Sequence, residues 1–388
     1  MKIRLTILIC LLGFALKGFS EEEPKFKVTP SGRVLIDGAF YFGGNEDMFK
    51  NGMAIPEARL GAKMSYGKWS SWIDVGFAYG KIGLRNMWVQ YDFNQNNSIR
   101  IGNYLQPFGI QGVSTTSVKS TFEQPLVSAL FTPGLQLGGM YTFQNPHVYS
   151  STSFHVESSA LTNIMNFPEF NKQGFTLLSR VAWRKNKSET TEHSILQAGL
   201  SAAASSPQRR LEDGFDYHDG FANSANFPSK VSNREALGFT IGNAKALFKF
   251  SPEFLFSKGR LAMQAQYFLQ VITRKDNLPD FISHGGYVTL RGLILGNTAY
   301  AYDPVGAQLS NPKKKTLECV VDYNYASLSD KKAHVWGGRA NSFNLTFNYY
   351  FNPYITARLN YCYTHVWDRK DFQPATQNVV QARIMVLF

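Results

Sequence analysis

The sequence predicts an all-β protein, a transmembrane antiparallel β-barrel of about 16 strands. Three observations predict it: an amino-terminal export signal, apolar residues that alternate with polar ones, and a carboxy-terminal strand that ends in Phe388. Along 377–388, every second residue from Val380 is apolar, and Gln381 and Arg383 fall between them. This is the period of a strand with one apolar face. An apolar outward face that ends in an aromatic residue is typical of the closing strand of an outer-membrane barrel.

Residues 1–20 have the features of a secretory signal peptide. Lys2 and Arg4 precede an apolar run, and Gly18-Phe-Ser20 provides small residues at a cleavage site. The run is too short to be a membrane-spanning helix. We expect residues 21–31 to be an amino-terminal periplasmic segment and residues 32–388 to form the barrel domain. The expected location is the outer membrane of a Gram-negative bacterium, in contact with its lipid.

Alternating segments bounded by turn residues recur through the rest of the chain. Their even number suits a bacterial barrel, and their lengths suit strands that cross a membrane at a tilt. Short Asn, Pro and Gly turns mostly alternate with longer connections, which we place outside the cell, with both termini in the periplasm. Segment 296–314 is long for a periplasmic turn. The predicted strands are 32–44, 54–66, 70–80, 84–93, 98–108, 135–144, 147–156, 173–184, 191–202, 236–250, 259–272, 284–295, 315–326, 341–351, 354–366 and 377–388.

The faces of these strands predict a polar interior. In 354–366, Ile355 and Leu359 fall on one face while Thr356 and Arg358 fall on the other. Charged residues at intervals along the inner face would disfavour a soluble sandwich core and suit a water-filled channel.

The formal net charge of +12 is spread along the chain. It includes no long basic tract of the kind that nucleic-acid-binding tails carry, so no nucleic acid partner is expected. The positive excess fits either passage of anions or contact with anionic lipid headgroups. Cys319 and Cys362 fall on opposite faces, which disfavours a disulfide, and no metal site or cofactor is expected.

Several stretches resemble the phosphate-selective porin O and P family. Ala58-Arg59-Leu60-Gly61 is similar to its second-strand segment, and 99–109, which ends in Pro107-Phe108-Gly109, is similar to its Gly-x-aromatic-x-x-Pro-Phe-Gly motif. The following residues up to Glu123, the Gly138-Gly139 pair and the block 338–388 also resemble the family. The similarity runs with gaps from about 30 to 388.

The resemblance implies a trimeric barrel of sixteen strands, with a third loop folded into the lumen as a constriction. In this chain that loop is 109–134, after the fifth strand. By position, Arg59 and Lys119 match regions where the family places anion-binding cations. Family members often carry further basic residues before that arginine, where this chain has Pro56 and Glu57. A lysine often precedes the x-Pro-Phe-Gly, where this chain has Leu105.

Cations that line a narrow lumen attract anions and repel cations, and an arginine can bind two phosphate oxygens at once. The alternative for each candidate is a structural pair with a nearby acid, such as Glu57, Asp74 or Asp92. The predicted pore-lining and anion-binding residues are Arg59, Lys63, Arg100, Lys119, Arg180, Arg184, Arg358 and Arg383.

No catalytic residues are predicted. The histidines lack HExxH spacing, and no Gly-x-Ser-x-Gly elbow is present in the sequence. The sequence therefore favours a porin for passive diffusion of small, phosphate-like anions, and we expect it to be a homotrimer. Two alternatives stay open: a general non-selective porin, and a plugged barrel that serves as an adhesin or scaffold.

Overall fold

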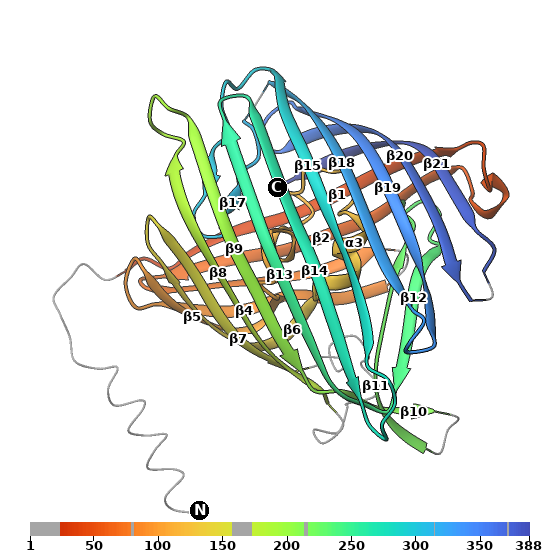
Figure 1. Ribbon diagram of the computed structural model, residues 1–388. Coiled ribbons are helices and arrows are strands. Elements are labelled where there is room, and N and C mark those ends of the chain that lie inside the picture. The colour runs from red at the N-terminus through yellow and green to blue at the C-terminus, as the bar shows by residue number, and fades with distance from the viewer. Residues whose placement is uncertain (1–23, 79–80, 157–172, 213–215, 314, 371) are drawn as a thin grey trace, which may run out of the picture.

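A computed structural model describes residues 24–78, 81–156, 173–212, 216–313, 315–370 and 372–388. Sixteen antiparallel strands form a closed barrel, in which the first strand pairs with the last (Figure 1). The wall strands, in order, are β1 (Lys27–Tyr41), β2 (Gly52–Tyr66), β3 (Trp69–Ala78), β4 (Lys81–Asp92), β5 (Asn97–Leu105), β6 (Leu135–Gln144), β7 (Val148–Val156), β8 (Phe175–Lys187), β9 (Ser194–Ser205), β13 (Ala244–Lys258), β14 (Leu261–Arg274), β15 (Phe281–Leu295), β18 (Thr316–Asp330), β19 (Val335–Tyr350), β20 (Ile355–Arg369) and β21 (Ala375–Leu387).

The burial of side chains follows the predicted alternation. On β20, Ile355 and Leu359 are exposed on the outside, while Thr356, Arg358 and Asn360 are buried on the inside. An apolar outer face around a polar interior is the arrangement that a barrel in lipid requires. The predicted fold class is confirmed. Among the described residues, no helix is both long and apolar enough to cross a membrane.

The two ends of the barrel differ in their connections. The short-turn end carries Phe388 and tight turns such as 67–68 and 259–260. The long-loop end carries the longer segments 106–134 and 206–243. Short and long connections mostly alternate around the barrel, as the sequence predicted, with exceptions at 331–334, which is short, and between β15 and β18, where the connection is long.

Most of the predicted strands lie within a few residues of the observed ones. The first strand begins at Lys27 rather than at 32, so the end of the expected periplasmic segment 21–31 is part of the wall. Residues 1–20 lie outside the described part of the chain, and the signal peptide stays a prediction.

One predicted strand is wrong. Residues 236–250 do not form a single wall strand, because the chain turns at Asn243, which has a positive φ of 51°. The first part is β12 (Glu235–Gly242), which belongs to a separate sheet, and the wall strand β13 continues past Pro252 to Lys258. Proline has no backbone N–H to donate to a ladder. The ladder between β13 and β14 does skip residues 251 and 252 before it resumes at Glu253.

Several short elements lie outside the wall. α3 lies within the ring of strands (Figure 1). Together with α3, these elements comprise two further single turns of helix and two small sheets. They are η2 (Glu46–Met48), α2 (Gly109–Val113), α3 (Leu126–Phe131), the sheet of β10 (Gln208–Glu212), β11 (Asp216–Asn226) and β12, and the pair β16 (Tyr302–Asp303) and β17 (Gln308–Leu309).

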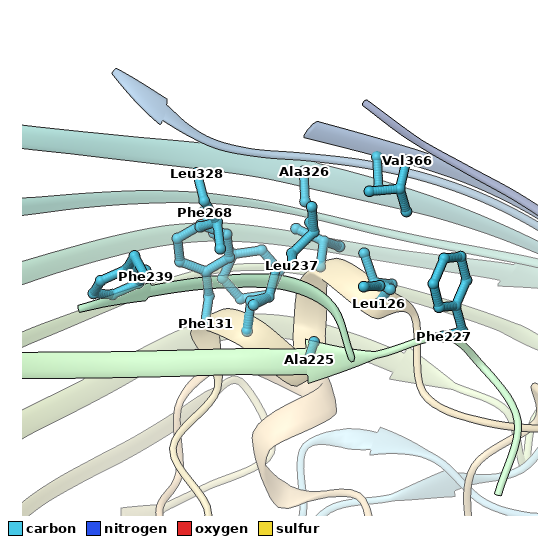
Figure 2. Packing of buried hydrophobic residues seen from close by; sticks show 14 of the residues in the cluster. Leu126, Phe131, Ala225, Phe227, Leu237, Phe239, Phe268, Ala326, Leu328 and Val366 are labelled. Atoms are coloured by element: carbon cyan, nitrogen blue, oxygen red, sulfur yellow. The ribbon is translucent and has the colours of Figure 1, made fainter. Parts of the chain in front are cut away.

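An apolar core fills part of the interior. Leu126 and Phe131 of α3 and Leu237 and Phe239 of β12 pack with Phe268 of the wall, and all are buried (Figure 2). The Phe131 and Phe268 rings are stacked with centroids 5.5 Å apart. Removing these large side chains from water stabilises the inserted elements by roughly 1.5–3 kcal/mol for each residue. This part of the interior is therefore packed rather than open.

Candidate functional site in the lumen

The constriction loop, defined here as residues 106–134, connects β5 to β6 and runs inside the barrel. Its entry is the Pro107-Phe108-Gly109 motif. Phe108 is fully buried, and Gly109 has a φ of +69°, which favours glycine. A Cβ on Gly109 would lie 1.7 Å from the amide nitrogen of Gln266, and its backbone N–H donates to Ser201 Oγ at 2.9 Å. The motif thus sets the direction in which the loop enters the lumen.

Two of the predicted arginines hold this loop against the wall. Arg358 donates to the carbonyl oxygens of Lys119 and Thr121, at 2.6 and 2.9 Å. Arg383 donates to both carboxylate oxygens of Asp37, at 2.7 and 2.6 Å, and also to the carbonyl oxygen of Phe122 at 2.7 Å. Both side chains are buried. Their guanidinium groups act as structural ties between β20, β21 and the loop.

Two other predicted arginines hold a second segment. The connection from β15 to β18 lies at the short-turn end. Its residues 296–313 fold into the lumen, and we call them the inward turn. Arg180 donates to the carbonyl oxygens of Gly306 and Ala307, both at 3.0 Å, and Arg184 donates to that of Pro304 at 2.6 Å. The length of 296–314, which did not fit a periplasmic turn, is explained by this insertion.

The charge of Arg180 is balanced by an acid on β13. Its Nε and Nη2 donate to the two oxygens of Glu253, at 3.0 and 2.8 Å, and both side chains are fully buried. A paired, buried guanidinium of this kind is costly to disturb because the remaining charge would be unpaired.

Arg59 lies in a chain of charges on β1, β2 and β3. Its Nε is 2.7 Å from Glu57 and its Nη1 is 3.4 Å from Asp74, and Glu57 also accepts from Arg33. The acid pairing that we considered as the alternative for Arg59 is present. Thr116 of the constriction loop donates to Glu57 at 3.3 Å, so this network also contacts the loop.

Lys119 lies on the constriction loop, where its Nζ donates to Gln124 at 2.6 Å. Burial lowers the pKa of the Lys119 ammonium to about 8, against the attraction of Glu123. Although burial opposes it, the cations Lys230 and Arg383 lower the pKa of Glu123 to about 2. At pH 7 the loop therefore carries both charges.

Cations outnumber acids around the constriction loop. The cations are Arg33, Arg59, Lys119, Lys230, Arg358 and Arg383, and the acids that contact them are Asp37, Glu57, Asp74 and Glu123.

A cavity of about 1070 Å³ lies at the short-turn end, and we call it the vestibule. Lys63 and Arg100 line it, together with Lys27 and Lys68 and the acids Asp92 and Asp303. Arg100 donates through Nε and Nη2 to the Gln90 amide oxygen, at 2.9 and 2.7 Å. No carboxylate among the described residues forms an ion pair with either Lys63 or Arg100. These two of the eight predicted cations are thus the ones that face open space with unbalanced charge.

The site contains residues that sequence reasoning missed. Trp72 and Trp88 line the vestibule, and their inward positions on β3 and β4 were available from the alternation. Lys249 lines a second cavity of about 310 Å³ at the long-loop end and donates to the Phe131 carbonyl oxygen at 3.1 Å. It lies between the outward residues Phe248 and Phe250, a pattern that could have identified it.

Other chemistry finds little support in the described part of the chain. It contains no group of three or more His, Cys, Asp or Glu residues that could hold a metal ion. Cys319 and Cys362 are both free thiols on opposite faces of the wall, as predicted.

Comparisons with known proteins agree with this architecture. A family model described as phosphate-selective porin O and P matches residues 31–388. The structure is similar to an anion-selective porin from Comamonas acidovorans (12% identity, 94% of this chain and 100% of that chain, TM-score 0.57). It is also similar to OprB of Pseudomonas putida (10% identity, 94% of each chain, TM-score 0.59). A third similar structure is the trimer form of OmpT, an outer membrane protein of Vibrio cholerae (12% identity, 94% and 99%, TM-score 0.55). No curated protein sequence matched significantly.

Proposed function

The chain belongs to the phosphate-selective porin O and P family, and we propose that this outer-membrane porin passes small anions, phosphate-like ones among them, by passive diffusion. The protein is a channel and not an enzyme. The observation that carries the proposal is the excess of cations over acids along the lumen, both at the constriction loop and in the vestibule.

The excess acts through the electric field of the lumen. Charges of one sign in a narrow, low-dielectric opening concentrate ions of the other sign and speed their entry. Lys63 and Arg100 supply this field in the vestibule, since no acid pairs with them in the described residues. Fast passage also requires weak binding at several sites, which cations on a solvated wall can provide.

Tight phosphate capture has less support than general anion preference. Arg59 is already paired with Glu57 and Asp74, which reduces its attraction for a passing ion. Leu105 occupies the position at which family members often carry a lysine, and it adds no charge. Arg59 and Lys119 remain our candidates for phosphate contact, since both lie where the loop meets the wall.

The test is the reversal potential of the purified porin in a planar bilayer under a KCl gradient, followed by addition of phosphate. We expect anion selectivity and a partial block by millimolar phosphate, which Arg59→Ala and Lys119→Ala weaken. Lys331→Met, which removes an exposed cation from a turn at the long-loop end, serves as the matched control and should change neither property.

Other outcomes separate the alternatives. Anion selectivity without a phosphate block would leave a general anion porin. A current without ion preference would contradict the electrostatic argument and favour a non-selective porin. A stable barrel without any conductance would favour the plugged barrel.

We also propose a homotrimer, based on the height of the wall. Strands β3 to β7 have 9 to 12 residues, whereas β13 to β15 and β18 to β20 have 14 to 16. A tilted strand needs about 9–11 residues to cross the hydrocarbon core. Strands β3 to β7 are therefore only just long enough to span it. A neighbouring subunit packed against β3 to β7 would shield their exposed apolar residues, among them Ile73, Ile82 and Ile101. Native mass spectrometry in detergent tests this: a trimer mass supports the proposal, and a monomer mass contradicts it.

A further inference from the structure

A row of inward residues crosses four neighbouring strands in the vestibule. Lys63 on β2 is the register partner of Trp72 on β3, Trp72 is the partner of Trp88 on β4, and Trp88 is the partner of Gly102 on β5. Arg100 lies two residues before Gly102 on the same strand and lines the same cavity. Register alone therefore brings two cations and two indoles together.

The cations lie close to the aromatic rings. The Lys63 Nζ is 4.9 Å from the Trp72 ring centroid, and the Arg100 Cζ is 4.2 Å from that of Trp88. The Tyr104 ring centroid is 5.6 Å from the same Arg100 Cζ. All three distances are within the range for cation–π attraction. The two indoles are perpendicular with centroids 6.5 Å apart, so they present differently oriented surfaces.

Gly102 makes this close packing possible. Its φ is +136°, and a Cβ at this position would lie 2.5 Å from the Trp88 Cα. Any larger residue would displace the strand that carries Trp88. The glycine of the family-like motif thus fixes the position of the indole on which Arg100 lies.

Several donors of this group have no protein partner among the described residues. Arg100 uses Nε and Nη2 on Gln90, which leaves its Nη1 without an acceptor. The indole N–H of Trp72 and the hydroxyl of Tyr104 also lack partners among the described residues, but both atoms are buried too deeply for a molecule in the cavity to reach them. The Lys63 ammonium and Arg100 Nη1, on residues that line the cavity, are therefore the donors available to a ligand with acceptor atoms.

We propose that the vestibule binds aromatic carboxylates, small anions in which a flat ring carries an acidic group. The carboxylate would accept hydrogen bonds from Lys63 and Arg100. The ring would pack against the Trp72 and Trp88 indoles, as aromatic pairs do. This inference rests on the proposed anion passage and specifies a substrate class for it.

The charge and size of the vestibule agree with this class. Asp92 and Asp303 offset part of the positive charge of the four lining cations, which favours a singly charged carboxylate over a doubly charged anion. The volume of about 1070 Å³ is slightly above the usual range for small-molecule sites, ~300–1,000 Å³.

The experiment compares three monocarboxylates with the intact porin: benzoate, cyclohexanecarboxylate and acetate. Binding is measured by isothermal titration calorimetry in detergent, and block of the chloride current is measured in a planar bilayer. Benzoate and cyclohexanecarboxylate have the same charge and similar size, but only benzoate has a flat π-system. We expect benzoate to bind about fivefold more tightly than cyclohexanecarboxylate, since aromatic pairing contributes ~0.5–1.5 kcal/mol beyond buried area. Acetate should bind most weakly.

Variants locate the preference. Trp72→Leu and Trp88→Leu should each reduce the benzoate preference to near unity. Trp69→Leu, which changes an exposed tryptophan on the outer face of β3, should leave it intact. If the tryptophan variants fail to fold, Lys63→Met provides the second test, because it should weaken both cyclic acids while keeping both indoles.

Equal binding of benzoate and cyclohexanecarboxylate to the unmodified porin would overturn the inference, as would a preference that survives in both tryptophan variants. These results are distinguishable from failure of the proposed function, because anion selectivity is read separately from the reversal potential in KCl. A selective pore without benzoate preference would retain the proposed function alone.

Discussion

Arg383 and Arg100 are both inward arginines of the barrel wall, yet their surroundings differ in kind. Arg383 is fully buried, and its donors are used by Asp37, Glu123 and the Phe122 carbonyl oxygen. Arg100 donates to the neutral amide of Gln90 and lies on the rings of Trp88 and Tyr104 beside a cavity. The comparison shows that a lumen arginine can either hold the structure together or contribute to the electric field that attracts anions. Which of the two it does depends on the groups that accept its hydrogen bonds.

The same contrast separates the two ends of the interior. Toward the long-loop end, α3, β11 and β12 pack an apolar core against the wall (Figure 2). At the short-turn end, the vestibule keeps cations and aromatic rings around open space. Rigid support and ion contact are therefore assigned to different residues, and substitutions should affect them separately.

The largest expected effect comes from breaking a tie. Arg383→Ala should lower the free energy of unfolding by about 3–5 kcal/mol, because it leaves the buried Asp37 carboxylate without its cation. Denaturant unfolding of the detergent-solubilised barrel, followed by tryptophan fluorescence, measures this change. Arg383→Lys keeps the charge but cannot donate to both Asp37 oxygens as the planar guanidinium does, so its decrease in the free energy of unfolding should be intermediate. Unchanged stability in Arg383→Ala would remove the structural role.

Release of the inward turn is the next effect. Arg180→Gln should increase the single-channel conductance. Asp303, Val305 and Gly306 of this turn line the vestibule, and the turn would lose the two hydrogen bonds that Arg180 donates to it. Single-channel recording at constant voltage measures it. The double variant Arg180→Gln/Glu253→Gln avoids an unpaired acid and should show the same increase, whereas an unchanged conductance in both would show that the turn does not limit the current.

Neutralising the vestibule cations should alter selectivity and leave stability intact. A unit charge at about 4 Å interacts with an ion by about 1 kcal/mol in water and about 4 kcal/mol near a protein surface. Lys63→Met/Arg100→Gln should therefore reduce the anion-to-cation permeability ratio by at least about fivefold. The reversal potential and the unfolding midpoint are measured together. A large loss of stability would mean that these residues are ties as well.

The smallest effect concerns pH. The pKa of Lys119 is lowered to about 8, so its ammonium is charged at pH 7 and loses its proton as the pH rises through 8. Anion selectivity should decline modestly between pH 7 and 9, with the sign set by loss of a positive charge. Lys119→Met should have the lower selectivity at pH 7 and lack this step. A wild-type selectivity that stays constant over this range would contradict the assignment.

The wall could largely be predicted from the sequence, because a two-residue period determines which side chains face lipid and requires no tertiary information. The failure at 236–250 is instructive. Leu237, Phe239 and Ile241 alternate as a wall strand does, but their apolar face packs on the interior core. Periodicity alone cannot distinguish these two environments.

The candidate site was less predictable for a related reason. Inward orientation on the strands identified seven of the cations, and the loop position identified Lys119. The partners of Arg180, Arg184, Arg358 and Arg383 come from loop backbone or from residues more than 30 positions away. The path of the constriction loop and the inward turn decides these contacts. The row of Lys63, Trp72 and Trp88 depends on strand register, which alternation does not specify.

The most direct test of the division between ties and field-producing cations is the reversal potential of two variants measured side by side. Arg100→Gln removes an unbalanced charge, whereas Arg180→Gln/Glu253→Gln removes a balanced pair of the same wall. We predict that Arg100→Gln shifts the reversal potential toward that of a non-selective pore, and that the double variant keeps the wild-type value. An unchanged potential in Arg100→Gln, or an equal shift in both, would contradict the account.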